Sequence, residues 1–180
     1  PAADAARKSQ PATLGDLAKR SAPIDRAATV NADAAQAAES YQAFLQIEGA
    51  DAALRAQALR RLGDLRLADA EAAIARDGDE TEVARELASQ AIDAYRQLLS
   101  EQPSFAAADA VLYQLARALE HVDDAPGAAA TLDRLVSQYP GSSYFAEAQF
   151  RRGEGFFSEQ RYADAERAYA AVLAGGRGTE

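Results

Sequence analysis

The segments AIDAYRQLLSEQP (residues 91–103), AAATLDRLVSQYP (128–140) and AERAYAAVL (165–173) of this 180-residue chain repeat one another at a fixed spacing. Each segment begins with an alanine, and successive alanines are 37 residues apart. Three further columns keep this step, and they hold Tyr95, Leu132 and Tyr169, then Leu98, Leu135 and Val172, then Pro103 and Pro140. A fixed period of this length predicts an array of repeated structural units rather than one unrepeated globular core.

Apolar residues recur at steps of three and four along most of the chain, which is the spacing of one face of an α-helix. Alanine, the strongest helix former, supplies 47 of the residues, and runs that favour strands are few. Short breaks such as HVDDAPG and YPGSS separate the periodic segments, and loops of this length join antiparallel neighbours. The sequence therefore predicts an all-α chain of about seven helices, at 31–48, 51–76, 81–101, 107–121, 125–139, 143–159 and 162–174.

The first repeated unit is longer than the other two. Gly153 and Ala116 occupy the same column 37 residues apart, whereas Gly63 lies 53 residues before Ala116. The difference of 16 residues corresponds to the stretch LADAEAAIARDGDETE at 67–82, which we expect to lengthen the first hairpin. Gly78, within this stretch, is predicted to end the first helix of that hairpin.

These columns resemble the tetratricopeptide repeat, whose pattern is a large residue, Leu-Gly and an aromatic, then alanine, an aromatic, a small or aliphatic residue and proline. The resemblance covers residues 56–173 and departs from the pattern at Arg66 and Arg152, where an aromatic and a leucine are usual. The matching residues are Leu59, Leu62, Gly63, Ala91, Tyr95, Leu98 and Pro103 in the first unit, Leu112, Leu115, Ala116, Leu119, Ala128, Leu132, Leu135 and Pro140 in the second, and Gly153, Phe156, Ala165, Tyr169 and Val172 in the third.

The resemblance implies a right-handed superhelix built from antiparallel helix hairpins. We expect the repeat domain to span 31–174, between a flexible arm at 1–30 and a disordered tail at 175–180. Inside the domain, the expected parts are a half repeat at 31–48 and units at 56–103, 109–142 and 146–174.

Gly153 and Gly155 stand on either side of Glu154, a spacing that raises the question of a phosphate-binding loop. Such a loop needs a third glycine after a strand, or a lysine followed by serine or threonine, and neither is present. In the repeat interpretation, Gly153 and Ala165 are small because the two helices of a hairpin approach there, with Phe156 and Tyr169 filling the space beside them. We therefore expect no nucleotide and no other cofactor.

Composition argues against several kinds of site. Nineteen basic and 28 acidic residues give a net charge of −9, which disfavours nucleic acid and anionic lipid as partners. Cysteine is absent, and His121 is the single histidine, predicted to be a helix cap or an exposed loop residue. The acidic stretch at 77–82 lacks the spacing of a calcium loop, and no apolar run approaches the length of a membrane helix. We expect no catalytic site, no metal site and no membrane insertion.

The arginine-rich helix faces, such as LRRLGDLR at 59–66, form the candidate binding surface, although the interspersed acidic residues also fit a solvated face. In stacked helix hairpins, the first helix of each unit lines the concave face. The resemblance implies that this groove is lined by Arg60, Arg61, Asp64, Tyr113, Gln114, Arg117, Phe150, Arg151 and Glu154. Guanidinium groups beside aromatic rings suit a peptide carboxylate or an acidic segment.

We expect a non-catalytic scaffold that binds a protein or peptide partner in this groove. The 37-residue spacing and the YPGSS turn resemble the bacterial cell-envelope members of the family, such as outer-membrane assembly lipoproteins and the Tol-associated periplasmic coordinator, which implies a periplasmic or envelope-associated part of a larger protein. Two alternatives stay open, a helical non-catalytic arm of a peptidoglycan-acting envelope enzyme and a cytoplasmic scaffold. The last helix ends in Ala171, Val172 and Leu173 without a polar cap, which favours further repeats or self-association through this face.

Overall fold

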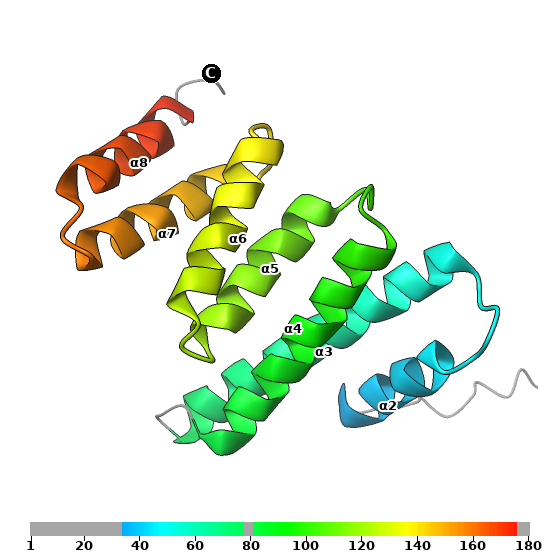
Figure 1. Ribbon diagram of the computed structural model, residues 1–180. Coiled ribbons are helices and arrows are strands. Elements are labelled where there is room, and N and C mark those ends of the chain that lie inside the picture. Colours follow the sequence, from blue (N-terminus) through cyan, green and yellow to red (C-terminus); the bar gives the residue numbers. More distant parts are fainter. Residues whose placement is uncertain (1–33, 78–80, 176–180) are drawn as a thin grey trace, which may run out of the picture. The chain divides into compact units, whose positions relative to one another are not determined.

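The computed structural model describes residues 34–77 and 81–175, and this part of the chain forms helices without any strand (Figure 1). Each predicted helix is present within it, with ends shifted by a few residues at most. The predicted arm at 1–30, Gly78 and residues 176–180 of the predicted tail lie outside the described residues. The helices are α2 (Ala34–Leu45), α3 (Ala52–Asp77), α4 (Glu82–Glu101), α5 (Ala108–Glu120), α6 (Ala125–Gln138), α7 (Phe145–Ser158) and α8 (Tyr162–Gly175).

Consecutive helices pack as antiparallel hairpins, α3 with α4, α5 with α6 and α7 with α8 (Figure 1). Successive hairpins meet through α4 with α5 and through α6 with α7, while α2 packs on α3. The array of helix hairpins predicted from the repeat is therefore confirmed. The first hairpin is longer because α3 and α4 have 26 and 20 residues, compared with 13 and 14 in α5 and α6.

Side-chain caps and one recurring turn conformation set the starts of several helices. Thr81 Oγ1 accepts a hydrogen bond from the Ala84 N–H at 3.2 Å, and Asp124 Oδ1 accepts one from the Gly127 N–H at 2.9 Å. In the turns before α6 and α8, Asp123 and Gln160 adopt positive φ angles of 60° and 62°. These two residues are also 37 positions apart, so the repeat extends to the backbone of the turn.

The repeat columns supply the core. Leu59 and Leu112 from the first helices, and Leu98 and Leu135 from the second helices, have at most 1% of their surface exposed. Burying each leucine contributes roughly 1.5–3 kcal/mol to stability before the loss of chain entropy is counted. The third hairpin departs from this pattern because Gln149 occupies the column of Leu59 and Leu112, at 8% exposure. The third hairpin therefore buries an amide side chain where the other two bury a leucine.

The small residues of the repeat make room for a ring from the second helix of the same hairpin. A Cβ atom placed on Gly63 would lie 2.5 Å from Cε1 of Tyr95, and one placed on Gly153 would overlap the ring of Tyr169. The close approach expected at Gly153 is therefore confirmed, and the approaching group is a tyrosine ring. In the middle unit the corresponding residues are Ala116, in place of glycine, and Leu132, in place of tyrosine. The methyl group of the alanine is thus matched by a side chain smaller than tyrosine.

Phe156 on α7 is half-buried and has charged neighbours that the repeat pattern did not predict. Its ring contacts the guanidinium groups of Arg152 and Arg161, whose central carbons are 5.5 and 4.4 Å from the ring centroid. Arg152 reaches this position because Asp133 of α6 holds its Nε at 2.6 Å. A cation–π contact thus takes the place of purely apolar packing at this column.

Candidate functional site

The nine predicted groove residues come from α3, α5 and α7, three from each helix. Contacts between neighbouring helices bring these rows together. Arg117 of α5 forms an ion pair with Glu71 of α3, and the guanidinium of Arg151 on α7 lies 5.7 Å from the ring centroid of Tyr113 on α5. We call this set the first-helix surface, and it comprises Arg60, Arg61, Asp64, Tyr113, Gln114, Arg117, Phe150, Arg151 and Glu154.

On α3, two neighbours hold the carboxylate of Asp64. The Tyr95 hydroxyl donates a hydrogen bond of 2.9 Å to Oδ1, and Nε of Arg60 lies 3.7 Å from Oδ2. Burial raises the pKa of Tyr95 far above its ordinary value, and the Asp64 charge raises it further, so the phenol stays a neutral donor. Asp64 therefore joins the two helices of the first hairpin, while the Arg61 side chain is exposed.

On α5, Arg117 is held between two helices. Its guanidinium pairs with Glu71, and its Nη1 donates a hydrogen bond of 3.0 Å to Oε1 of Gln114. His121 caps the end of α5, as predicted, and its Nε2 lies 3.6 Å from the same Glu71 carboxylate. Glu71 belongs to the inserted stretch, which has no counterpart in the other units, so no column of the repeat pointed to it.

On α7, Arg151 pairs with two carboxylates. Its Nη1 donates to Oε2 of Glu120 at 2.6 Å, and its Nε lies 3.3 Å from Oε1 of Glu147. Partial burial lowers the pKa of Arg151, but Glu120, Tyr113 and Glu147 together outweigh that effect and raise the pKa above its ordinary value. The four-residue spacing of Glu147 and Arg151 on a helix could have identified one of these pairs in the sequence. The contact with Glu120 requires the third hairpin to pack against the second.

Aromatic rings line the same part of the surface. Tyr113 stacks on Tyr144, the residue that precedes α7, with centroids 4.8 Å apart and planes 21° apart. Phe150 is 48% exposed and lies 5.9 Å from the ring of Tyr169, measured between centroids. The Tyr169 hydroxyl donates a hydrogen bond to Glu154. Tyr169 and Glu154 thus form in the third hairpin the same hydrogen bond that Tyr95 and Asp64 form in the first.

The arginines of the first-helix surface are largely engaged within the chain. Arg60, Arg117 and Arg151 each pair with a carboxylate, so a ligand carboxylate would have to displace Asp64, Glu71 or Glu120. The exposed members of the surface are Arg61, Phe150 and Glu154.

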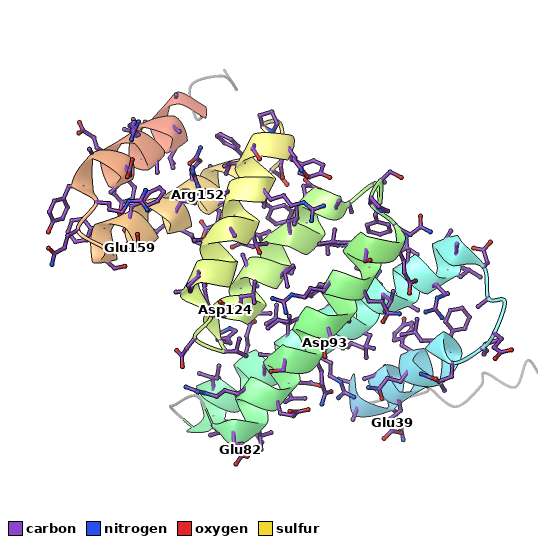
Figure 2. The ribbon with its side chains drawn as sticks, viewed as in Figure 1. Glu39, Glu82, Asp93, Asp124, Arg152 and Glu159 are labelled. Carbon is purple, nitrogen blue, oxygen red and sulfur yellow. The ribbon has the colours of Figure 1, made fainter. Side chains whose placement is uncertain are left out.

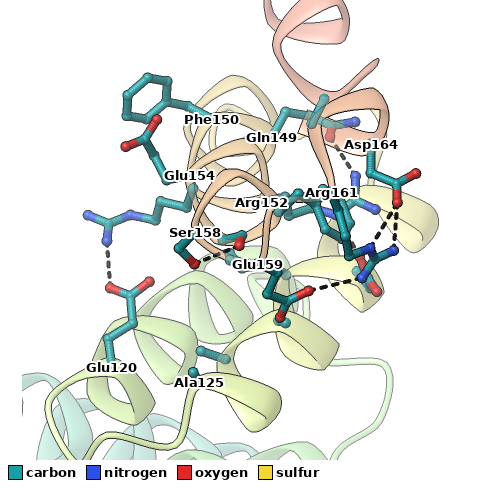
Figure 3. Close-up of a pocket in the computed structure, with 18 of the residues that line it drawn as sticks. Glu120, Ala125, Gln149, Phe150, Arg152, Glu154, Ser158, Glu159, Arg161 and Asp164 are labelled. Carbon is teal, nitrogen blue, oxygen red and sulfur yellow. Dashed lines mark hydrogen bonds and ion pairs between the residues drawn. The ribbon is translucent and has the colours of Figure 1, made fainter. Parts of the chain in front are cut away.

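A cavity of about 970 Å³ lies beside α7, with walls from α5, α6, α7 and α8 (Figure 3). Ala125, Leu132 and Phe156 contribute apolar surface, and the side-chain oxygen of Gln149 accepts a hydrogen bond of 2.6 Å from Nη1 of Arg152. Its charged lining comprises the carboxylates of Glu120, Asp133, Glu147, Glu154, Glu159 and Asp164, and the guanidinium groups of Arg151, Arg152, Arg161 and Arg167. The lining therefore mixes apolar and charged groups, and its charged groups are more negative than positive.

Residues 34–77 and 81–175 contain no group of three or more histidine, cysteine, aspartate or glutamate side chains arranged to hold a metal ion. Within the same residues, no helix is both long and apolar enough to cross a membrane.

Comparison with known proteins agrees with the repeat seen in the structure. Residues 110–142, which include most of the α5–α6 hairpin, match the tetratricopeptide repeat family model. Among solved structures, the chain is similar to one titled "Crystal structure of MamA", with a TM-score of 0.56 and 16% identity, over 91% of this chain and 74% of that chain. At this identity the likeness concerns the fold. Among curated proteins, none matches the sequence.

Proposed function

We propose that the chain is a non-catalytic interaction scaffold whose first-helix surface receives a segment of a partner protein. The observation that carries the proposal is the continuity of this surface across three helices, secured by the Arg117–Glu71 and Arg151–Glu120 pairs. Exposed groups at its two ends, Arg61 on α3 and Phe150 on α7, remain accessible to a partner. Aromatic and arginine side chains in such a setting are the residue types that dominate binding energy at protein interfaces.

The compartment is a separate part of the proposal. The 37-residue spacing and the YPGSS turn at 139–143 support an envelope-associated, periplasmic setting within a larger bacterial protein. Leu173 at the end of α8 is 65% exposed, which supports contact of this face with a further repeat or a second copy.

The test is an affinity capture with matched variants, from bacterial envelope and cytosolic extracts in parallel. Arg61→Ala/Phe150→Ala removes two exposed groups of the first-helix surface. Arg76→Ala/Val83→Ala removes an exposed arginine and an apolar residue that is 64% exposed, both near the end of the lengthened first hairpin. We expect a partner to be retained by the wild type and the control but lost by the first-helix variant, with equal helicity in all three. Retention by all three would contradict the proposed surface.

A further inference from the structure

We infer that the partner segment is basic, and that a lysine or arginine side chain of the partner binds at the α7 end of the first-helix surface, beside Phe150 and Glu154. This inference rests on the proposed function and adds the chemistry of the ligand. Three features of the described residues carry it, namely the charge balance of the cavity, the unneutralised carboxylate of Glu154 and the exposed ring of Phe150.

The first feature is the charge of the cavity beside α7. Six carboxylates and four guanidinium groups line it, and every one of these arginines already has an acidic neighbour. Arg151 pairs with Glu120 and Glu147, and Arg152 with Asp133. Arg161 pairs with Glu159 and Asp164, and Arg167 with the same Asp164. The remaining charge is negative, as is the charge of the whole chain, and it attracts cations.

The second feature is Glu154, whose charge is not neutralised by an arginine among the described residues. Its carboxylate accepts a hydrogen bond from Tyr169, and this bond raises the pKa of the phenol, so the donor stays uncharged. A carboxylate has about four acceptor positions, so Glu154 can also accept from an ammonium or guanidinium group. Glu147 is exposed and lies two turns before Glu154 on α7. Glu147 and Glu120 share the single guanidinium group of Arg151.

The third feature is the ring of Phe150, one helical turn before Glu154. Residues four apart on a helix are neighbours, so the exposed ring and the carboxylate can contact the same side chain. Figure 3 shows the two side chains on the same side of α7. The aliphatic stem of a lysine or arginine can cover the ring while the charged end reaches Glu154. The chain contains the same arrangement nearby, where Arg151 lies over Tyr113 and pairs with Glu120.

An acidic partner segment would be disfavoured at the same place. Three of the four guanidinium groups that would attract it, those of Arg60, Arg117 and Arg151, are held by Asp64, Glu71 and Glu120, so binding to them would require breaking existing pairs. The same segment would then lie next to Glu147 and Glu154, and like charges in contact oppose binding. The ion pairs thus leave Arg61, on α3, as the exposed arginine of the surface, and a carboxylate ligand is disfavoured at the α7 end.

The experiment is fluorescence anisotropy of labelled octapeptides in which glycine alternates with lysine or with glutamate. The test variant is Glu147→Gln/Glu154→Gln, because glutamine keeps an acceptor for Tyr169 and Arg151 while removing the charge. The control is Glu39→Gln/Asp93→Asn, which removes two exposed charges from α2 and α4 (Figure 2). We expect the Kd of the lysine peptide to rise at least about fivefold in the test variant and to change less than about twofold in the control. The glutamate peptide should bind more weakly than the lysine peptide to every form.

Equal losses in test and control variants would overturn the inference, because they would mean attraction to the net charge alone. Tighter binding of the glutamate peptide, or no binding of the lysine peptide, would also overturn it. A partner captured by the wild type and lost by Arg61→Ala/Phe150→Ala, yet not displaced by the lysine peptide, would leave the proposed function standing and reject the basic ligand. Capture that does not depend on the first-helix surface would reject the proposed function itself.

Discussion

Gly63→Ala tests whether close packing requires a glycine at this position. In a helix that lacks such a constraint, alanine is more stable than glycine by about 1 kcal/mol. Its added Cβ would lie 2.5 to 2.8 Å from three atoms of the Tyr95 ring. That ring cannot move aside easily, because it has no exposed surface and its hydroxyl is bonded to Asp64. Overpacking of this kind costs about 1–3 kcal/mol and more where the neighbour is fixed. We expect a net loss of about 1–2 kcal/mol.

Two companion variants make the reasoning specific. Gly153→Ala introduces the same overlap with Tyr169, but that ring is half-buried and can rotate towards solvent, so we expect a change of less than about 0.5 kcal/mol. Gly63→Ala/Tyr95→Leu reproduces the Ala116 and Leu132 combination of the middle unit. In the double variant each change relieves the other, so its loss should be smaller than the sum of the single losses by at least about 1 kcal/mol.

The assay is urea unfolding followed by far-ultraviolet circular dichroism, with thermal unfolding as a second measure. For a chain of this size, 1 kcal/mol corresponds to about 2–4 °C in Tm. Additivity of Gly63→Ala and Tyr95→Leu within about 0.5 kcal/mol would refute the idea that the two side chains compete for one space. A loss at Gly153 equal to that at Gly63 would refute the role assigned to burial of the ring.

Three further outcomes are expected. Because the pKa of Tyr95 is raised in the folded chain but ordinary in the unfolded chain, stability should fall as the pH rises above about 10, and Tyr95→Phe should remove most of this fall in urea titrations. Asp124→Ala should lower stability by about 0.5–2 kcal/mol through loss of the α6 cap, whereas Asp124→Ser should retain most of it in the same unfolding assay. Gln149→Leu should raise Tm by a few degrees, because leucine occupies this buried column in the other hairpins; a lower Tm would show that the bond to Arg152 outweighs apolar packing.

The helices were predictable because their signals are local and repeated. The apolar steps, the capping Thr81 and the recurring alanine columns each indicate helix without reference to distant residues. The column that pairs Gly63 with Gly153 also predicted a close approach, and the structure adds that a tyrosine ring fills it. The contacts of Phe156 with Arg152 and Arg161 were not predicted, because Arg152 departs from the family pattern and Arg161 lies in the turn before α8.

The charged contacts of the first-helix surface could not be predicted in the same way. Glu71 reaches Arg117 only because the inserted stretch lengthens α3, and nothing in the sequence fixes where the end of that longer helix meets α5. Glu120 and Arg151 are 31 residues apart and meet through the packing of successive hairpins. Repeat columns identify which residues share a face, whereas ion pairing depends on distances of a few ångströms between faces.

This difference determines the chemistry of the proposed binding surface. Counted by residue type, the nine predicted positions include four arginines and two acids, and they favour an anionic ligand. Arg60 pairs with Asp64 within the set, and Glu71, Glu120 and Glu147 neutralise Arg117 and Arg151, so the charge around Phe150 becomes negative. A surface lined with arginines can therefore select a cationic partner, provided that its guanidinium groups are bound to carboxylates of the same chain that join the hairpins.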